Sequence, residues 1–179
     1  TGAGGHRGSF DEDNHSEVDG FSILSEIQEK VDIPIIYAGG IHNAKTLLAV
    51  RNLGAQGFQV GSLLLGSKES NLAEFAKERL REAKEEELVL TKSFSGRYAR
   101  GINNTFIKAM EASEKILPYP YQNKLTKALR KSAHTNQNTE FLSLWTGQVL
   151  PKFSGNSTTD ILKNLISEVN NYKPKPQIN

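Results

Sequence analysis

Two glycine turns follow two short apolar runs of the sequence. Gly39-Gly40 comes after the apolar run 33–38, and Gly61-Ser62 comes after the run 57–60. A glycine turn lets a ligand approach the backbone closely, so several N–H groups can point at one anion, and the Ser62 hydroxyl adds a donor. Such turns also serve as plain tight bends, but two of them after successive apolar runs favour a shared phosphate site.

A third glycine-rich segment surrounds a histidine. Residues 3–8 read Ala-Gly-Gly-His-Arg-Gly, which leaves little side-chain bulk beside His6. This setting suits a general base or a hydrogen-bond donor that faces a cofactor. Arg7 is expected at the surface or beside an acidic partner. The remaining histidines are expected to be solvated or to cap turns: His15, His42 and His134.

The elements that must position these turns alternate between helix and strand. Helical spacing of apolar residues predicts a helix over 22–31, capped by Ser22, and a second helix capped by Asn43. The runs 33–38 and 57–60 predict short strands, and the first of them is expected to be covered on both faces. Such alternation predicts a parallel sheet, and the glycine turns lie at the strand ends where α/β folds bind ligands.

Beyond Gly66 the sequence becomes richer in charged residues. We expect a solvated helix, a strand, an extended stretch and three further helices, at 70–87, 88–94, 98–102, 104–115, 121–133 and 157–169. The basic residues of 121–133 are expected to form a solvent-exposed face. No aromatic side chains alternate with them, which argues against a nucleic-acid role.

The composition excludes several classes of protein. The 179 residues carry a net charge of +2, 37% hydrophobic residues and no cysteine. The near-balanced charge does not indicate a nucleic-acid partner. The lack of cysteine excludes disulfides, Cys-ligated zinc, iron–sulfur clusters and a cysteine nucleophile. No apolar run is long enough to span a bilayer and no leader is recognisable, so we expect a cytoplasmic protein without a membrane or metal site.

In three segments, and in the same order, the sequence resembles the flavin-binding half of nitronate monooxygenases, formerly called 2-nitropropane dioxygenases. These segments are residues 3–8, 35–41 and 54–62. Residues 95–101 and 144–148 also resemble bacterial members of that family. The resemblance implies an FMN-dependent enzyme that oxidises alkyl nitronates, or nitroalkanes, with dioxygen to a carbonyl compound and nitrite.

The resemblance also implies roles for particular residues. His6 matches the active-site histidine of the family, as base or hydrogen-bond donor, and Gly4 matches a glycine that contacts the flavin. Gly40 and residues 59–62 match the grip on the FMN phosphate. The candidate cofactor-binding residues are therefore Gly4, Gly5, Gly39, Gly40, Gln59, Val60, Gly61 and Ser62.

The fold class expected from the resemblance is α/β, as the C-terminal part of a (β/α)8 TIM barrel with a smaller inserted α+β domain. Residues 1–66 would be closing strands and helices of the barrel, 67–142 an inserted lid on the substrate side, and 143–179 the return to the barrel with a frayed tail. A glycine turn normally follows a strand, and none precedes residues 2–8. We therefore expect the N-terminal half of the same barrel as a partner that supplies further flavin contacts.

Two alternative functions remain open from the sequence. One is an FMN-dependent enoyl-acyl-carrier-protein reductase, whose histidine turn also resembles Gly4-Gly5-His6. The other is a non-catalytic module that binds a phosphate ligand through the glycine turns.

Overall fold

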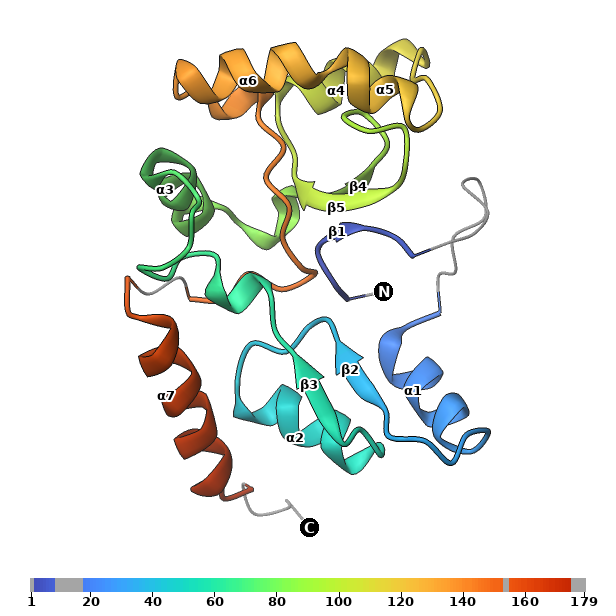
Figure 1. Cartoon of the computed structure of the whole chain (residues 1–179), viewed down its shortest axis with the longest axis vertical. Helices are drawn as coiled ribbons and strands as arrows, with labels where there is room; N and C mark the ends of the chain where they lie inside the picture. The colour runs from blue at the N-terminus through green and yellow to red at the C-terminus, as the bar shows by residue number, and fades with distance from the viewer. Residues whose placement is uncertain (1, 9–17, 153–154, 175–179) are drawn as a thin grey trace.

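The computed structural model describes residues 2–8, 18–152 and 155–174. Figure 1 shows two layers of elements, with the N-terminal segment running between them. Five short strands are present in the described part: β1 (Gly5–His6), β2 (Ile36–Ala38), β3 (Gly57–Gln59), β4 (Leu88–Thr91) and β5 (Ala99–Ile102). The α-helices there are α1 (Gly20–Gln28), α2 (Ala44–Asn52), α3 (Glu74–Glu82), α4 (Thr105–Ser113), α5 (Tyr121–Leu125), α6 (Lys127–Thr135) and α7 (Thr158–Asn170). Short 3-10 turns cover η1 (Ser62–Leu64), η2 (Glu85–Glu87) and η3 (Thr139–Phe141).

The first sheet is the parallel pair that the sequence predicts. Strand β2 pairs with β3 in register Tyr37↔Phe58, so the turns Gly39-Gly40 and Gly61-Ser62 leave the sheet at the same edge. Helix α2 connects the two strands, and α7 packs against α2. The structure is thus an α/β fold, and its strand order brings the two glycine turns together.

Helix capping explains where the helices of this layer begin. Asn43 accepts a hydrogen bond from the Thr46 N–H, as the sequence predicts for a cap of α2. The prediction of Ser22 as the cap of α1 is wrong. Asp19 caps that helix by accepting from the N–H groups of Phe21 and Ser22, because its carboxylate reaches two free donors of the first turn.

Strand β2 is covered on one face only. Its inner side chains, including Tyr37, pack on a core formed by Leu24, Ile41, Val50 and Ala55. On the other side Ile36 is 69% exposed, and nearby Ile33 is 70% exposed. The prediction of burial on both faces is therefore wrong for the described residues, since nothing among them packs on that outer surface.

The second sheet is antiparallel and joins the first strand to later ones, in the order β1-β5-β4. His6 lies opposite Ala99 and Gly5 opposite Arg100. The sequence predicts only a turn around His6, because a strand of two residues has no periodic pattern. The domain boundaries at residues 66 and 142 stay a prediction, but a strand from the first predicted part completes a sheet of the second.

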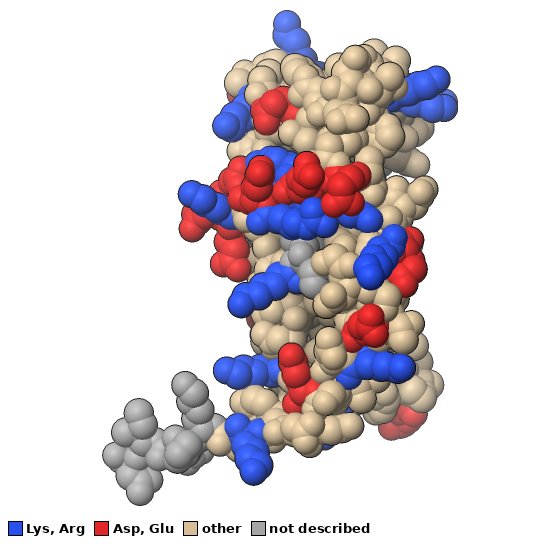
Figure 2. Space-filling view, turned by 90° about the vertical axis from the view of Figure 1, so that its left-hand side faces the viewer, with Lys and Arg blue, Asp and Glu red and all other residues tan. Residues whose placement is uncertain are grey.

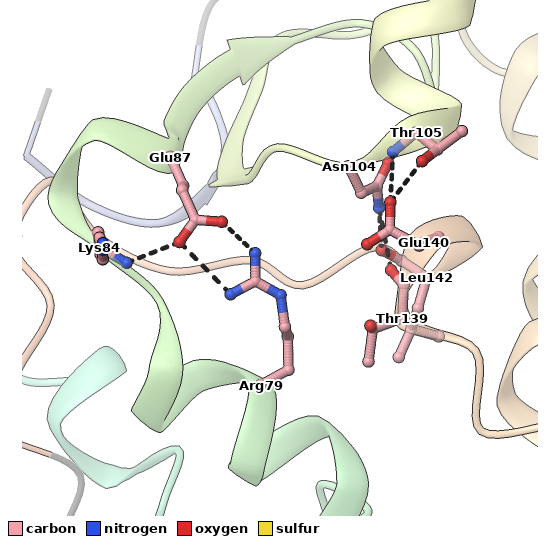
Figure 3. A network of polar contacts seen from close by, with 8 residues as sticks. All are labelled: Arg79, Lys84, Glu87, Asn104, Thr105, Thr139, Glu140 and Leu142. Carbon is pink, nitrogen blue, oxygen red and sulfur yellow. Dashed lines mark hydrogen bonds and ion pairs between the residues drawn. The ribbon is translucent and has the colours of Figure 1, made fainter.

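Side-chain hydrogen bonds join the helices above this sheet to the returning chain. Figure 3 shows Asn104 donating to the Leu142 carbonyl at 2.9 Å, while Glu140 accepts from the Thr105 N–H. In the same view Arg79 of α3 is paired with Glu87, which precedes β4. These contacts fix residues 139–142, from which the chain runs back toward the first layer.

Charges of both signs are mixed on the face that carries α3 and α7. Figure 2 shows Lys and Arg interspersed with Asp and Glu there, without a broad area of one sign. This face therefore offers no basic surface for a polyanion. No helix in the part of the chain that the structure describes is both long and apolar enough to cross a bilayer.

Candidate functional site

A cavity of about 290 Å³ lies where the two sheets and the returning chain meet. Its walls come from the N-terminal segment, from the ends of β2 and β3, and from residues near Trp145. Seven of the eight predicted cofactor-binding residues line it: Gly4, Gly5, Gly39, Gly40, Gln59, Gly61 and Ser62. The structure thus gathers residues from three separate glycine turns around one space.

The glycine turns present free backbone donors to this cavity. Within the described residues, no hydrogen bond engages the N–H groups of Gly40, Gly61 or Ser62. A Cβ at Gly40 or Gly61 would meet no atom of the described part of the chain within 4 Å. Free N–H groups beside open space form the kind of cradle that holds a phosphate, so the residues present fit the phosphate end of FMN.

Local contacts fix the shape of the first turn. Gly39 and Gly40 have φ values of 115° and 68°, which L side chains rarely adopt. His42 Nδ1 lies 2.9 Å from the Gly40 carbonyl and must donate to it, because a carbonyl oxygen only accepts. His42 thus holds the turn, in keeping with the capping role expected for it.

The returning chain closes one side of the cavity. The Gly147 N–H donates to Ser62 Oγ at 2.7 Å, and the Gln148 N–H donates to the Gly2 carbonyl at 3.0 Å. Gly4 packs so tightly here that a Cβ on it would lie 2.4 Å from the Thr146 carbonyl carbon. The local sequence of residues 144–148 does not reveal that this segment lies beside the glycine turns. That position depends on the contact between Gly147 and Ser62, which are 85 residues apart in the sequence.

Val60 lies apart from the other candidates. It does not line the cavity, and its side chain packs on the hydrophobic core below β2 and β3. Its proposed contact with a cofactor stays a prediction and could involve only the backbone. The alternation of side chains along an extended segment explains the difference from Gln59, which does line the cavity.

His6 extends from β1 beside the cavity, immediately after Gly5. Its Nε2 lies 2.8 Å from Ser95 Oγ, and its ring centroid lies 5.8 Å from that of Trp145, which lines the cavity. The residue remains exposed, and Nδ1 has no hydrogen bond with a described residue. A base at this position could therefore receive a proton on Nδ1 from a molecule bound next to the cavity.

Burial and nearby positive charges both favour the neutral form of His6. Partial burial of the ring lowers the pKa of His6 below its ordinary value of 6.5, and the nearby positive charges of Arg97 and Arg130 lower this pKa further. Neutral imidazole is the form that accepts a proton, so the surroundings favour a base at neutral pH. The same arginines would attract an anion bound near His6.

The segment 121–133 is not merely the solvated basic face that the sequence predicts. Gln122 and Thr126 are 1% and 4% exposed, and each donates to a backbone carbonyl of the loop that follows β4. Arg130 is the residue of this segment that acts on His6. The basic composition does not reveal these roles, because the contacting residues Gln122 and Thr126 are polar and lie close to lysines in the sequence.

For Arg7, His15 and His134 the sequence predicts no catalytic role. Arg7 is partly buried, which lowers its pKa. Burial also lowers the pKa of Arg100, and the positive charge of Arg7 lowers it further. His134 is exposed and meets Phe75 edge-on at 5.7 Å between ring centroids. His15 lies outside the described residues.

A family model for nitronate monooxygenase matches residues 1–168 of this chain. The chain belongs to the nitronate monooxygenase family. Its resemblance to that family, expected from the glycine and histidine motifs, is thereby confirmed. A protein described as a probable nitronate monooxygenase, from Staphylococcus aureus strain Newman, is 40% identical over 171 residues, which cover 94% of this chain and 48% of that protein.

Two solved structures are also similar to this chain. The nitroalkane oxidase from Streptomyces ansochromogenes superposes with a TM-score of 0.85 at 30% identity, over 94% of this chain and 49% of the other. FabK from Thermotoga maritima superposes with a TM-score of 0.75 at 25% identity, over 94% and 51%. The chain therefore spans about half the length of the relatives that it matches.

Proposed function

We propose that this chain forms the phosphate-binding and base-bearing part of an FMN-dependent enzyme that oxidises alkyl nitronates or nitroalkanes with dioxygen to a carbonyl compound and nitrite. The observation that carries the proposal is the cavity in which free N–H groups of two glycine turns lie next to the strand of His6. Family membership and the similarity to a nitroalkane oxidase support it.

FMN would be held chiefly through its phosphate. The N–H groups of Gly40, Gly61 and Ser62 would donate to the phosphate oxygens, and Ser62 Oγ could add a donor while it accepts from the Gly147 N–H. Gly4 and Gly5 would let the cofactor pass close to the backbone of the N-terminal segment. Bound FMN would supply the electron transfer between substrate and dioxygen.

His6 would remove the α-proton of a neutral nitroalkane. The proton would move to Nδ1, since Nε2 is engaged with Ser95. A preformed nitronate has already lost this proton, so toward that substrate His6 would act only as a hydrogen-bonding group. The positive charges of Arg97 and Arg130 would favour the nitronate anion that proton removal creates.

The state of His6 predicts how the reaction depends on pH. Because the pKa of His6 is lowered, kcat/KM for a neutral nitroalkane should stay high below pH 6.5 and fall only as pH drops through the lowered pKa. Arg130→Gln removes one positive charge near the ring, so the acid limb of the profile should move to higher pH. Steady-state rates measured across pH on both proteins test this, and a profile that Arg130→Gln leaves unmoved would contradict the electrostatic argument.

Assays of the purified native protein separate the proposal from its alternatives. Nitrite released from an alkyl nitronate in the presence of dioxygen is the expected result. NADH oxidation coupled to an enoyl thioester, without nitrite from nitronate, would instead indicate an enoyl-acyl-carrier-protein reductase. Purified protein without any flavin colour would favour a non-catalytic phosphate-binding module.

The exposed apolar surface of β2 supports a larger architecture. We propose that Ile33 and Ile36 are covered by further strands of a (β/α)8 barrel, its N-terminal half, in a cytoplasmic protein. Residues 1–179 expressed alone should then aggregate or retain little FMN, because part of the flavin's surroundings would be missing. A soluble monomer with a cooperative melt and stoichiometric flavin would contradict this and favour a self-contained open α/β domain.

A further inference from the structure

Ser95 contacts the candidate base His6 through a side-chain hydrogen bond. It lies in the loop between β4 and β5, is 2% exposed, and its Oγ lies 2.8 Å from His6 Nε2. In the sequence, Ser95 belongs to the segment 95–101 that resembles bacterial members of the family. Its contact with the candidate base indicates that it affects the orientation and the tautomer of His6.

The hydrogen bonds of Ser95 favour one of the two neutral tautomers of His6. Ser95 Oγ lies 3.0 Å from the Arg97 carbonyl, which only accepts, and 3.2 Å from the Arg97 N–H, which only donates. The hydroxyl has one proton, and giving it to the carbonyl leaves the oxygen as an acceptor toward His6. When Nε2 bears the hydrogen, Ser95 Oγ can donate to the Arg97 carbonyl and accept from both the Arg97 N–H and His6 Nε2–H.

We propose that Ser95 is a positioning residue that fixes His6 as the Nε2–H tautomer and leaves the lone pair on Nδ1 as the proton acceptor. Its use in catalysis rests on the proposed function, but the tautomer itself does not. When Nδ1 takes a proton, the Nε2–H bond to Ser95 can persist, so the ring need not turn during the transfer.

The loop that carries Ser95 is held on several sides. Gln122 Nε2 donates to the Ser93 carbonyl at 2.7 Å, and Thr126 Oγ1 donates to the Phe94 carbonyl at 2.6 Å. Phe94 is 1% exposed and packs edge-on against Trp145, with 5.9 Å between ring centroids. These contacts restrict the position of Ser95, so the hydrogen bond to its hydroxyl orients the His6 ring.

Ser93 provides a matched control in the same loop. It is also a buried serine, but its hydroxyl lies near Thr91 Oγ1 and Glu111 rather than near His6. Ser93→Ala removes the same atom from the loop without touching His6. A purely structural role of Ser95 predicts similar effects of the two alanine variants on the His6 ring.

The test is ¹⁵N NMR of the histidine side chains of the native protein, at a pH where His6 is neutral, with the His6 signals assigned by their loss in His6→Asn. Wild type and Ser93→Ala should show hydrogen on Nε2, Ser95→Ala should show a mixture of tautomers, and Ser95→Thr should restore the wild-type pattern. Ser95→Ala should also lower kcat for a neutral nitroalkane by about tenfold, part of the roughly 10²–10⁴-fold that a general base contributes, while Ser93→Ala should not.

Hydrogen on Nδ1 in the wild type would overturn the proposal, as would an unchanged tautomer in Ser95→Ala. Because the wild-type tautomer is read without a variant, the assignment is tested even if Ser95→Ala fails to fold. If the wild type turns over neither nitroalkane nor nitronate, the proposed function fails while the NMR result still decides the role of Ser95.

Discussion

Gly61→Val should abolish the retention of FMN by the native protein. The cavity beside Gly61 is open, since a Cβ there would meet no atom of a described residue within 4 Å, and its φ of −121° lies outside the left-handed region that favours glycine. The branched side chain would therefore extend into the place proposed for the phosphate. Flavin content per protein, measured by absorbance after gel filtration, should fall from near one to near zero.

Gly155→Val is the control for this variant. Among the described residues, a Cβ at Gly155 also meets no atom within 4 Å, and Gly155 is not among the residues that line the cavity. It should retain flavin and melt like the wild type. Full flavin content in Gly61→Val would mean that the phosphate lies elsewhere, and loss of flavin together with loss of the folded state would mean that Gly61 is needed for folding rather than for binding.

His6→Asn should retain flavin but lose turnover of neutral nitroalkanes by about 10²–10⁴-fold, the usual contribution of a general base. Turnover of preformed nitronates should fall far less, because the α-proton is already gone. The comparison of kcat on the two forms of one substrate isolates the proton transfer. Flavin absorbance of the variant shows that the cofactor site is intact.

His134→Ala is the matched histidine variant, since His134 is exposed and contacts Phe75 instead of the cavity. It should leave both rates unchanged. Equal losses on nitroalkane and nitronate in His6→Asn would assign His6 to binding or orientation. No loss on either substrate would remove His6 from the active site.

Much of the cavity could be predicted from local sequence because glycine turns carry a local signal. The turns at Gly39-Gly40 and Gly61-Ser62 end strands of apolar residues, and a parallel pair necessarily brings such ends together. The cap at Asn43 was predictable for the same reason, since its hydrogen bond reaches only three residues along the chain.

The parts that could not be predicted depend on contacts between distant segments. The bond between His6 and Ser95 spans 89 positions, and that between Ser62 and Gly147 spans 85. The sequence around Ser95 and around Gly147 contains no pattern that predicts which distant residue each of them contacts. Strand β1 could not be predicted either, because two residues are too few to show an alternating pattern. Gly5 and His6 form a strand only because they pair with β5.

The single helix predicted over 121–133 is divided into α5 and α6, and periodicity did not reveal the buried polar residues near this division. Gln122 and Thr126 lie among exposed lysines, and helical periodicity of apolar residues does not reveal a buried polar face. Their carbonyl partners belong to a loop whose path is set by the sheet. For β2 the sequence predicted more burial than the described residues provide. An apolar run indicates that a strand is buried, but it does not indicate which residues cover it.

The visible spectrum of the purified native protein shows whether it binds a flavin that reacts with nitronates. We expect flavin absorbance at about one flavin per protein. This absorbance should change when an alkyl nitronate is added without dioxygen and return when dioxygen is admitted, with release of nitrite. A colourless protein, or a flavin band that nitronate leaves unchanged, would contradict the proposed function.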